Sequence, residues 1–145
     1  MTKLQTPTTP QPNEEPQASD ASLRKVLEKF PEITLAMLFG SVAQGTATAS
    51  SDLDIAVAAR HHLSAEQKMA LITALADHTG RPIDLIDLNS IGQPLLSQIV
   101  MHGRRVLGSA AAHGELISRH LVEMADFMPL LNRILKERRE AWIGK

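Results

Sequence analysis

The spacing of apolar residues divides the first part of the chain into a helix and two strands. Residues 21–30 are amphipathic and predict a helix, started by Ser19 or Asp20. Residues 33–39 form a short apolar run, which is typical of a buried strand. In residues 52–58 apolar side chains occupy alternate positions, and this pattern predicts a second strand with one apolar face.

Capping signals mark the next helix, and a third strand follows it. Ser64 and Gln67 form a capping box at the start of this helix, and Gly80 is placed to end it. Residues 82–88 then predict a strand. The small residues over 41–51 predict a loop between the first two strands.

The last third of the chain is mainly helical in pattern. Residues 90–102 predict a helix, and residues 104–107 predict a short edge strand. A helical pattern then runs over 110–142, and we expect Gly114 and Pro129 to break or kink it.

Together these elements predict a small α/β (α+β) domain, with helices on one side of a short mixed sheet. Residues 1–20 hold four of the eight prolines among polar side chains, so we expect a disordered tail there. The folded domain is expected over 21–108, and a C-terminal helical segment over 109–145.

An apolar stripe follows the C-terminal segment at alternating steps of four and three residues. Such a stripe indicates a helix that buries one broad side. Two interpretations remain open, namely packing on the domain's own sheet and an interface with a partner. The stripe comprises Ile117, Leu121, Met124, Met128, Leu131 and Leu135, widened by Phe127, Leu130 and Ile134.

Composition narrows the possible functions. The 145 residues make one ordinary domain, and a net charge of −1 argues against a protein that binds nucleic acid through bulk charge. The chain has no cysteine, which excludes disulfides and thiolate catalysis. No segment is apolar enough to span a membrane or to act as a signal peptide, so the expected location is the cytoplasm.

Aspartates at the start of the second strand suggest metal chemistry. Asp52 and Asp54 are two residues apart, so their side chains should share one face. Neighbouring carboxylates repel unless cations lie between them, and Mg²⁺ prefers such oxygen ligands. If the third strand pairs beside the second, Asp84 completes a site for two ions about 3.5–4 Å apart. Alternation puts Asp84 and Asp87 on opposite faces, so only one of them can join the site. We favour Asp84, because Asp87 lies near the end of the strand.

A glycine-serine pair at the end of the first strand suggests a phosphate site. Gly40 lets the backbone approach a ligand, and the Ser41 hydroxyl with nearby backbone N–H groups can hold phosphate oxygens. A phosphate cradle beside a carboxylate pair is typical of a site for a nucleoside triphosphate and metal. Nucleotidyl transfer is therefore the predicted reaction, with Asp84 as metal ligand or base.

The order and spacing of these residues resemble a known family. Gly40-Ser41, ten further residues, Asp52-x-Asp54 and a later Asp84 are similar to the signature of minimal nucleotidyltransferases in the DNA polymerase β superfamily. More narrowly, they resemble the MntA-type antitoxins encoded beside HEPN-domain toxins. The resemblance covers the predicted domain from its first strand to its end, and implies the polymerase-β-like fold.

The resemblance also implies which residues form the site. It assigns catalysis and metal binding to Asp52, Asp54 and Asp84. It places the nucleotide at Gly40, Ser41, Gln44, Gly45 and Ser51.

The activity that the resemblance implies is protein modification. ATP is the expected donor, with two Mg²⁺ ions, and the acceptor is a tyrosine hydroxyl of a partner HEPN ribonuclease toxin. Addition of AMP would silence the toxin, and the two proteins are expected to form a hetero-oligomer. Two alternatives are an inactive antitoxin that acts by binding alone, and a transferase for a small molecule such as an aminoglycoside.

One departure from the family pattern concerns charge. Many relatives carry an arginine in the loop after the serine, where this chain has Val42-Ala43-Gln44-Gly45. Another cation is then expected to meet the triphosphate charge. The candidates, which the sequence does not rank, are Arg60, Lys68, Arg81 and Arg104.

Overall fold

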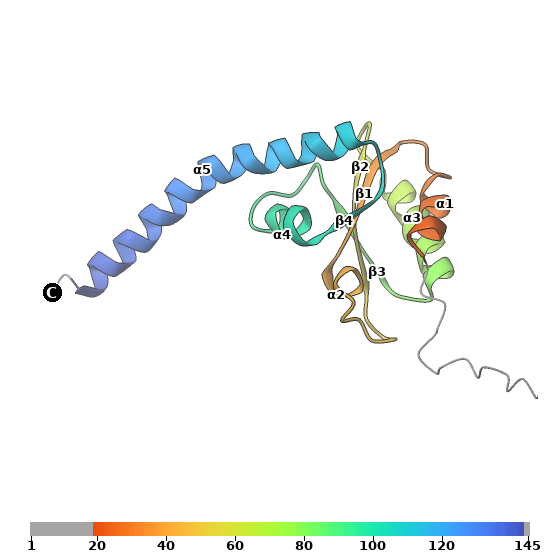
Figure 1. Cartoon of the computed structure of the whole chain (residues 1–145), viewed down its shortest axis with the longest axis horizontal. Helices are drawn as coiled ribbons and strands as arrows, with labels where there is room; N and C mark the ends of the chain where they lie inside the picture. The colour runs from red at the N-terminus through yellow and green to blue at the C-terminus, as the bar shows by residue number, and fades with distance from the viewer. Residues whose placement is uncertain (1–18, 144–145) are drawn as a thin grey trace, which may run out of the picture.

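A four-stranded mixed sheet forms the centre of the molecule (Figure 1). In this computed structural model, which describes residues 19–143, the strand order is β3-β2-β1-β4. The strands are β1 (Ile33–Phe39), β2 (Leu53–Ala59), β3 (Ile83–Asp87) and β4 (Arg104–Leu107). β1 is antiparallel to β2 and β4, whereas β2 is parallel to β3. The mixed sheet expected from the sequence is confirmed.

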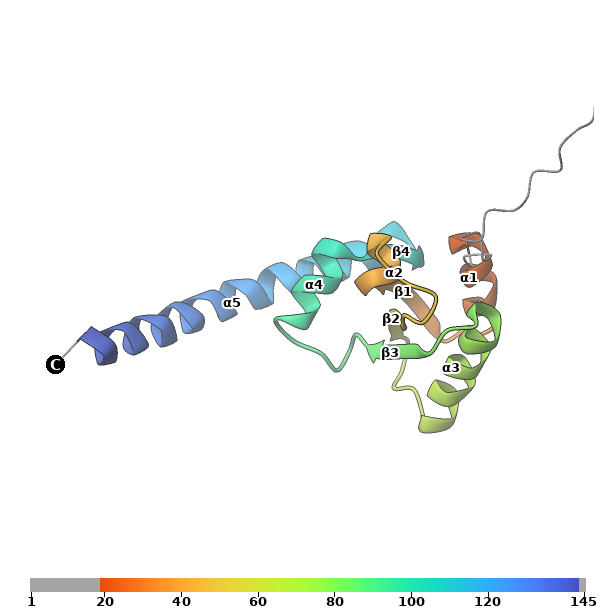
Figure 2. The same ribbon diagram turned by 90° about the horizontal axis from the view of Figure 1, so that it is seen from below.

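Helices cover both faces of this sheet (Figures 1 and 2). α1 (Asp20–Leu27) and α3 (Ala65–Thr79) pack on one face. α4 (Leu95–His102) and the first turns of α5 (Ala110–Ile143) pack on the other. α2 (Gly40–Gln44) is a short helix directly after β1.

The expectation of helices on one side only is wrong, and β1 gives the reason. Ala36 and Leu38 contact the core beneath α1 and α3, while Leu35 and Met37 contact the core beneath α4 and α5. All four side chains are almost completely buried. An uninterrupted apolar run of this kind is what a strand shows when both of its faces are covered.

Local signals predicted several elements well. β1 has the predicted bounds, and Ser19 caps α1 by accepting a hydrogen bond from the Ser22 N–H. The capping box of α3 is present, because Ser64 Oγ accepts from the Gln67 N–H at 3.1 Å and Ser64 N–H donates to Gln67 Oε1 at 2.9 Å. These interactions are satisfied within a few residues, so the sequence alone reveals them.

Three predicted boundaries are wrong. The expected loop over 41–51 begins with α2, and the helix expected over 90–102 starts only at Leu95, directly after Pro94. A proline lacks the N–H that an interior helical position uses, and it is favoured at a helix start. The expected break at Gly114 or Pro129 does not occur, because α5 continues through both residues as one helix that bends along its length (Figure 1).

Residues 1–18 and 144–145 lie outside the described part of the chain, and the predicted tail falls mostly there. Its last two residues, Ser19 and Asp20, cap and begin α1. Within residues 19–143, no helix is long and apolar enough to cross a membrane.

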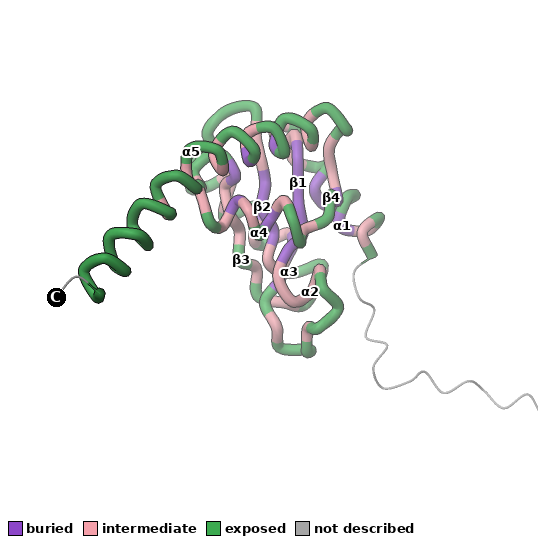
Figure 3. Tube along the Cα trace, turned by 60° about the vertical axis from the view of Figure 1, so that its left-hand side comes forward, coloured by how far each residue is buried: buried purple, intermediate pink, exposed green. Residues whose placement is uncertain are grey.

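Only the first part of α5 packs on the domain (Figure 3). Leu116 and His120 are buried against the sheet layer, whereas none of residues 121–143 is buried. Arg119 anchors this part, because its guanidinium donates hydrogen bonds to the carbonyls of Leu88 and Ile91 and pairs with Glu123 at 2.8 Å. The stripe itself is not buried by this packing, because its first members Ile117 and Leu121 are 36% and 62% exposed.

Candidate active site

The register of two parallel strands brings Asp54 beside Asp84. In the β2–β3 ladder Asp54 pairs with Asp84, and in the β1–β2 ladder Asp54 pairs with Phe39, the last residue of β1. Residues in register on adjacent strands point to the same face of a sheet. The site predicted from the spacing thus has two of its carboxylates as neighbours.

Asp87 lies on the opposite face, as its position in the strand predicts. It pairs in register with Val57, whose side chain is part of the core beneath α1 and α3. Its carboxylate accepts hydrogen bonds from the Asn89 N–H at 2.9 Å and the Ser90 hydroxyl at 3.2 Å. Asp87 therefore stabilises the turn after β3.

Asp52 lies just before β2 and is exposed. Its charge is nevertheless one of the causes that raise the pKa of Asp54. Among residues 19–143, no three carboxylate or imidazole side chains converge into a ready-made metal site. Asp52 is thus close enough to affect the pKa of Asp54, but Asp52, Asp54 and Asp84 do not form a three-ligand metal site in the structure.

The electrostatics of the pair favour a cation. Burial raises the pKa of Asp54 above its ordinary value, and the Asp84 carboxyl, by charge and by hydrogen bonding, and the Asp52 charge raise it further. Each of these causes disfavours the negatively charged form of Asp54. Oxygen ligands with this property suit a hard divalent ion such as Mg²⁺, which would remove the repulsion.

Gly40 makes room for the Asp54 carboxylate. Its φ is +71°, and a Cβ at this position would lie 2.0 Å from Asp54 Oδ2. Glycine is therefore required here both by the left-handed backbone and by the approach of the carboxylate. The close approach that the sequence suggested for a ligand is made by a side chain of the site itself.

The remaining predicted nucleotide contacts lie in α2 and the loop after it. Ser41 is the second residue of α2, next to Gly40, and Gly45 ends the helix with a φ of +73°. Gln44 is exposed at the same turn. The Ser51 hydroxyl accepts a hydrogen bond from the Thr48 N–H at 2.9 Å, so it already has a partner within the loop.

The family model described as Polymerase beta, Nucleotidyltransferase matches residues 21–111. The chain belongs to this family. It is therefore a nucleotidyltransferase, and its sheet with flanking helices is the polymerase-β-like fold expected from the sequence.

Two kinds of relative are similar to this nucleotidyltransferase. The protein adenylyltransferase MntA of Shewanella oneidensis is 35% identical over 94 residues, which are 64% of this chain and 68% of the relative. A toxin–antitoxin structure with AMP-PNP has a TM-score of 0.65 and 29% identity, and the match covers 81% of this chain and 98% of that one. A complex of tri-AMPylated Shewanella oneidensis HEPN toxin with MNT antitoxin has a TM-score of 0.59 and 26% identity, covering 80% and 95% of the two chains.

Two of the four candidate cations of this nucleotidyltransferase lie beside the site loops. Arg104 donates to the Ala43 carbonyl in α2 at 3.0 Å and pairs with Asp20 at 2.9 Å. Arg81 donates to the carbonyls of Thr48 and Ser51, in the loop that leads to Asp52. These contacts join residues far apart in the chain, and no local signal in the sequence indicates them.

Arg60 and Lys68 lie elsewhere. Arg60 follows the end of β2, where its N–H donates to the Glu32 carbonyl before β1, and Lys68 is in the first turn of α3. Both positions are at the end of the sheet away from Asp54. The structure therefore favours Arg81 and Arg104 over the other two.

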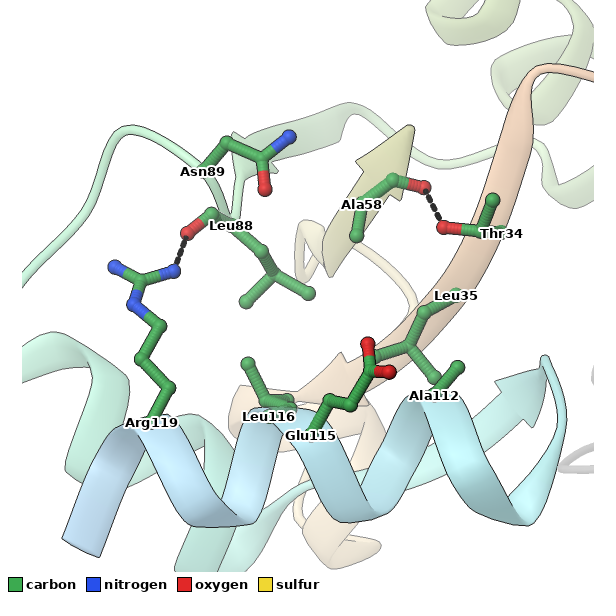
Figure 4. A pocket seen from close by; sticks show the side chains of 9 residues that line it. All are labelled: Thr34, Leu35, Ala58, Leu88, Asn89, Ala112, Glu115, Leu116 and Arg119. Carbon is green, nitrogen blue, oxygen red and sulfur yellow. Dashed lines mark hydrogen bonds between the residues drawn. The ribbon is translucent and has the colours of Figure 1, made fainter. Parts of the chain in front are cut away.

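A cavity of about 180 Å³ lies at this same far end, between the sheet and α5 (Figure 4). It is smaller than the roughly 300–1,000 Å³ of a typical site for a small-molecule ligand. Arg119 turns its guanidinium to the Leu88 carbonyl, as the figure shows. The lining residues are Thr34, Leu35, Ala58, Leu88, Asn89, Ala112, Glu115, Leu116 and Arg119.

We predict that Gly40→Ala destabilises the protein by roughly 1–3 kcal/mol, because it strains the backbone and collides with Asp54. Gly45→Ala is the matched control, since Gly45 has a φ of +73° but an added Cβ there would meet no atom within 4 Å. Urea unfolding of both variants measures the difference. Equal losses of unfolding free energy would show that the Asp54 contact is unimportant.

We predict that Asp54→Asn raises the Tm of the metal-free protein at pH 7. The pKa of Asp54 is raised on folding, so the stability it contributes is full below the unfolded pKa and is lost as pH rises through the folded pKa. The amide removes this loss, so a rise in Tm is expected at pH 7 and none at pH 3. Thermal melts in EDTA measure it.

Asp77→Asn is the control for this experiment, because Asp77 is exposed on α3. Its Tm should equal that of the wild type at both pH values. A lower Tm for Asp54→Asn at pH 7 would contradict the assignment of repulsion at the site.

Proposed function

We propose that this protein is a Mg²⁺-dependent protein adenylyltransferase. It transfers AMP from ATP to a tyrosine hydroxyl of a cognate HEPN ribonuclease toxin in the cytoplasm, and thereby acts as the antitoxin. The observation that carries the proposal is the placement of Asp54 in register with Asp84 and against Gly40. The adenylyltransferase MntA and the AMPylated toxin complex among its relatives support the substrate assignment.

The carboxylates hold the metal and the acceptor proton in this proposal. Asp52, Asp54 and Asp84 would bind two Mg²⁺ ions, which when bound neutralise phosphate charge and favour the ionised acceptor. The tyrosine oxygen forms a bond to the α-phosphorus of ATP, the bond from that phosphorus to pyrophosphate breaks, and Asp84 accepts the tyrosine proton. The products are the AMP-tyrosine ester, pyrophosphate and a proton.

The segment between β1 and β2 binds the nucleotide. Backbone N–H groups at the start of α2 and the Ser41 hydroxyl contact the phosphates, and Gln44 and Gly45 line the same turn. Ser51 contributes through its loop, whose carbonyls Arg81 holds. Arg104 holds α2 in the same way and supplies positive charge near the phosphates.

We expect the wild type to add AMP to the toxin encoded beside it, and Asp52→Ala with Asp54→Ala to lower the rate by at least about 100-fold. Incubation with labelled ATP, Mg²⁺ and the toxin measures transfer. The chain contains no tyrosine, so every labelled tyrosine belongs to the partner. Failure of the wild type to label the toxin would refute the proposal.

The pair Asp84→Asn and Asp87→Asn separates the two aspartates of β3. Asp84→Asn should abolish transfer as the double alanine variant does, since Asp84 faces Asp54. Asp87→Asn should retain activity within about threefold, because Asp87 faces the other side of the sheet. Toxin neutralisation by the double alanine variant would instead favour an antitoxin that acts by binding alone.

A further inference from the structure

The outer part of α5, residues 121–143, exposes many large apolar side chains. Leu121 is 62% exposed, Leu135 53% and Trp142 89%. Soluble proteins rarely leave contiguous apolar patches larger than a few hundred Å² uncovered. The residues of α5 from 121 onward that are large, apolar and exposed are Leu121, Val122, Met128, Leu130, Ile134, Leu135, Trp142 and Ile143.

Most of these side chains lie on one side of the helix. At 100° per residue, the positions from Ile134 through Leu135 to Leu121 span roughly 140° of the helix circumference. Met128 and Trp142 lie within this sector, which we call the apolar band; Arg138 is a charged residue within it, near the C-terminal end of the helix. Arg133 and Glu137 lie opposite it.

The width of the band indicates the shape of its partner. A helix that pairs with a single second helix uses a narrow seam at two of every seven positions, flanked by charged residues that select the partner. Beside the seam formed by Leu121, Met128 and Leu135, one side carries Phe127 and Ile134, which widen it into the band. The other side carries Ala125 and Asn132, and a charge enters there only at Arg139. A band this wide fits a groove between two helices better than the α5 of a second copy.

The structural relatives favour the toxin as the partner that offers this groove. The family model ends at residue 111, at the start of α5. The match to the toxin–antitoxin structure with AMP-PNP covers 81% of this chain and 98% of that one. It is therefore longer than the family match, which covers 91 of the 145 residues. This chain therefore spans almost the whole of the matched chain in a toxin–antitoxin structure.

We propose that the apolar band is the docking surface for the HEPN toxin and seats in a groove between two toxin helices. This inference rests on the proposed function for the identity of the partner. The band lies on a different element from the carboxylates, which sit at the starts of β2 and β3. In this proposal α5 binds the acceptor protein, while residues of the sheet catalyse the transfer.

The test compares two sets of alanine substitutions in the full chain. The band variant carries Leu121→Ala, Met128→Ala and Leu135→Ala, and the control carries Arg133→Ala and Glu137→Ala on the opposite side. Alanine favours helix, and circular dichroism checks that α5 persists. If helicity falls, the single substitution Leu135→Gln replaces the band variant.

Calorimetry with the purified toxin from the neighbouring gene, without ATP, measures affinity. We expect the band variant to bind the toxin at least about tenfold more weakly, and the control within about twofold of wild type. In the transfer assay the band variant should raise the KM for toxin and leave kcat and Mg²⁺-ATP binding unchanged.

Toxin affinity of the band variant within about twofold of wild type would overturn the proposal. So would a wild type that does not bind the toxin, or self-association that the band variant loses while it keeps its toxin affinity. If the toxin binds through the band but receives no AMP, docking stands and the adenylyltransferase proposal fails. If AMP transfer is normal in the band variant, the docking proposal is refuted and the adenylyltransferase proposal stands.

Discussion

The close placement of two carboxylates on neighbouring parallel strands, one of them partly buried, is the constraint on which the candidate site depends. Asp54 and Asp84 face one another in register, and the pKa of Asp54 is raised as a result of burial and of its acidic neighbours. The hydrogen bonds of the β2–β3 ladder hold the two together although like charges repel. Gly40 lies against the Asp54 carboxylate, at a position where any β carbon would collide with it.

Such an arrangement needs a rigid support, and the two-sided core provides it. β1 and β2 bury side chains on both faces, so the strands that carry the site cannot shift without disturbing packing on one side or the other. Arg81 and Arg104 add polar contacts at the surface, where they hold backbone carbonyls of the loop and of α2. The site is thus fixed by the sheet and its adjoining segment is held by two guanidinium groups.

Chemistry and apolar surface are separated in this nucleotidyltransferase. The sheet end that bears the carboxylates is polar, whereas the outer part of α5 exposes large apolar side chains along one side. Arg119 and Leu116 fix the first turns of α5 to the domain, and these contacts determine the direction in which the rest of the helix leaves it.

The sequence by itself determined the features that depend on neighbours along the chain. The strand at 33–39, the capping box at Ser64 and the two-residue spacing of Asp52 and Asp54 all follow from local periodicity and hydrogen bonding. The same spacing led to the polymerase β family, which the match over 21–111 confirms. Alternation also assigned Asp84 and Asp87 to opposite faces of their strand.

Only the tertiary structure decided which distant groups meet. The second helical layer, the continuity of α5 through Pro129 and the start of α4 after Pro94 depend on packing that local propensity does not encode. The sequence proposed four cations without ranking them, and the fold favours Arg81 and Arg104 because their partners are brought close across more than 25 residues of chain. Local pattern specifies the elements, whereas the burial of both sheet faces specifies their neighbours.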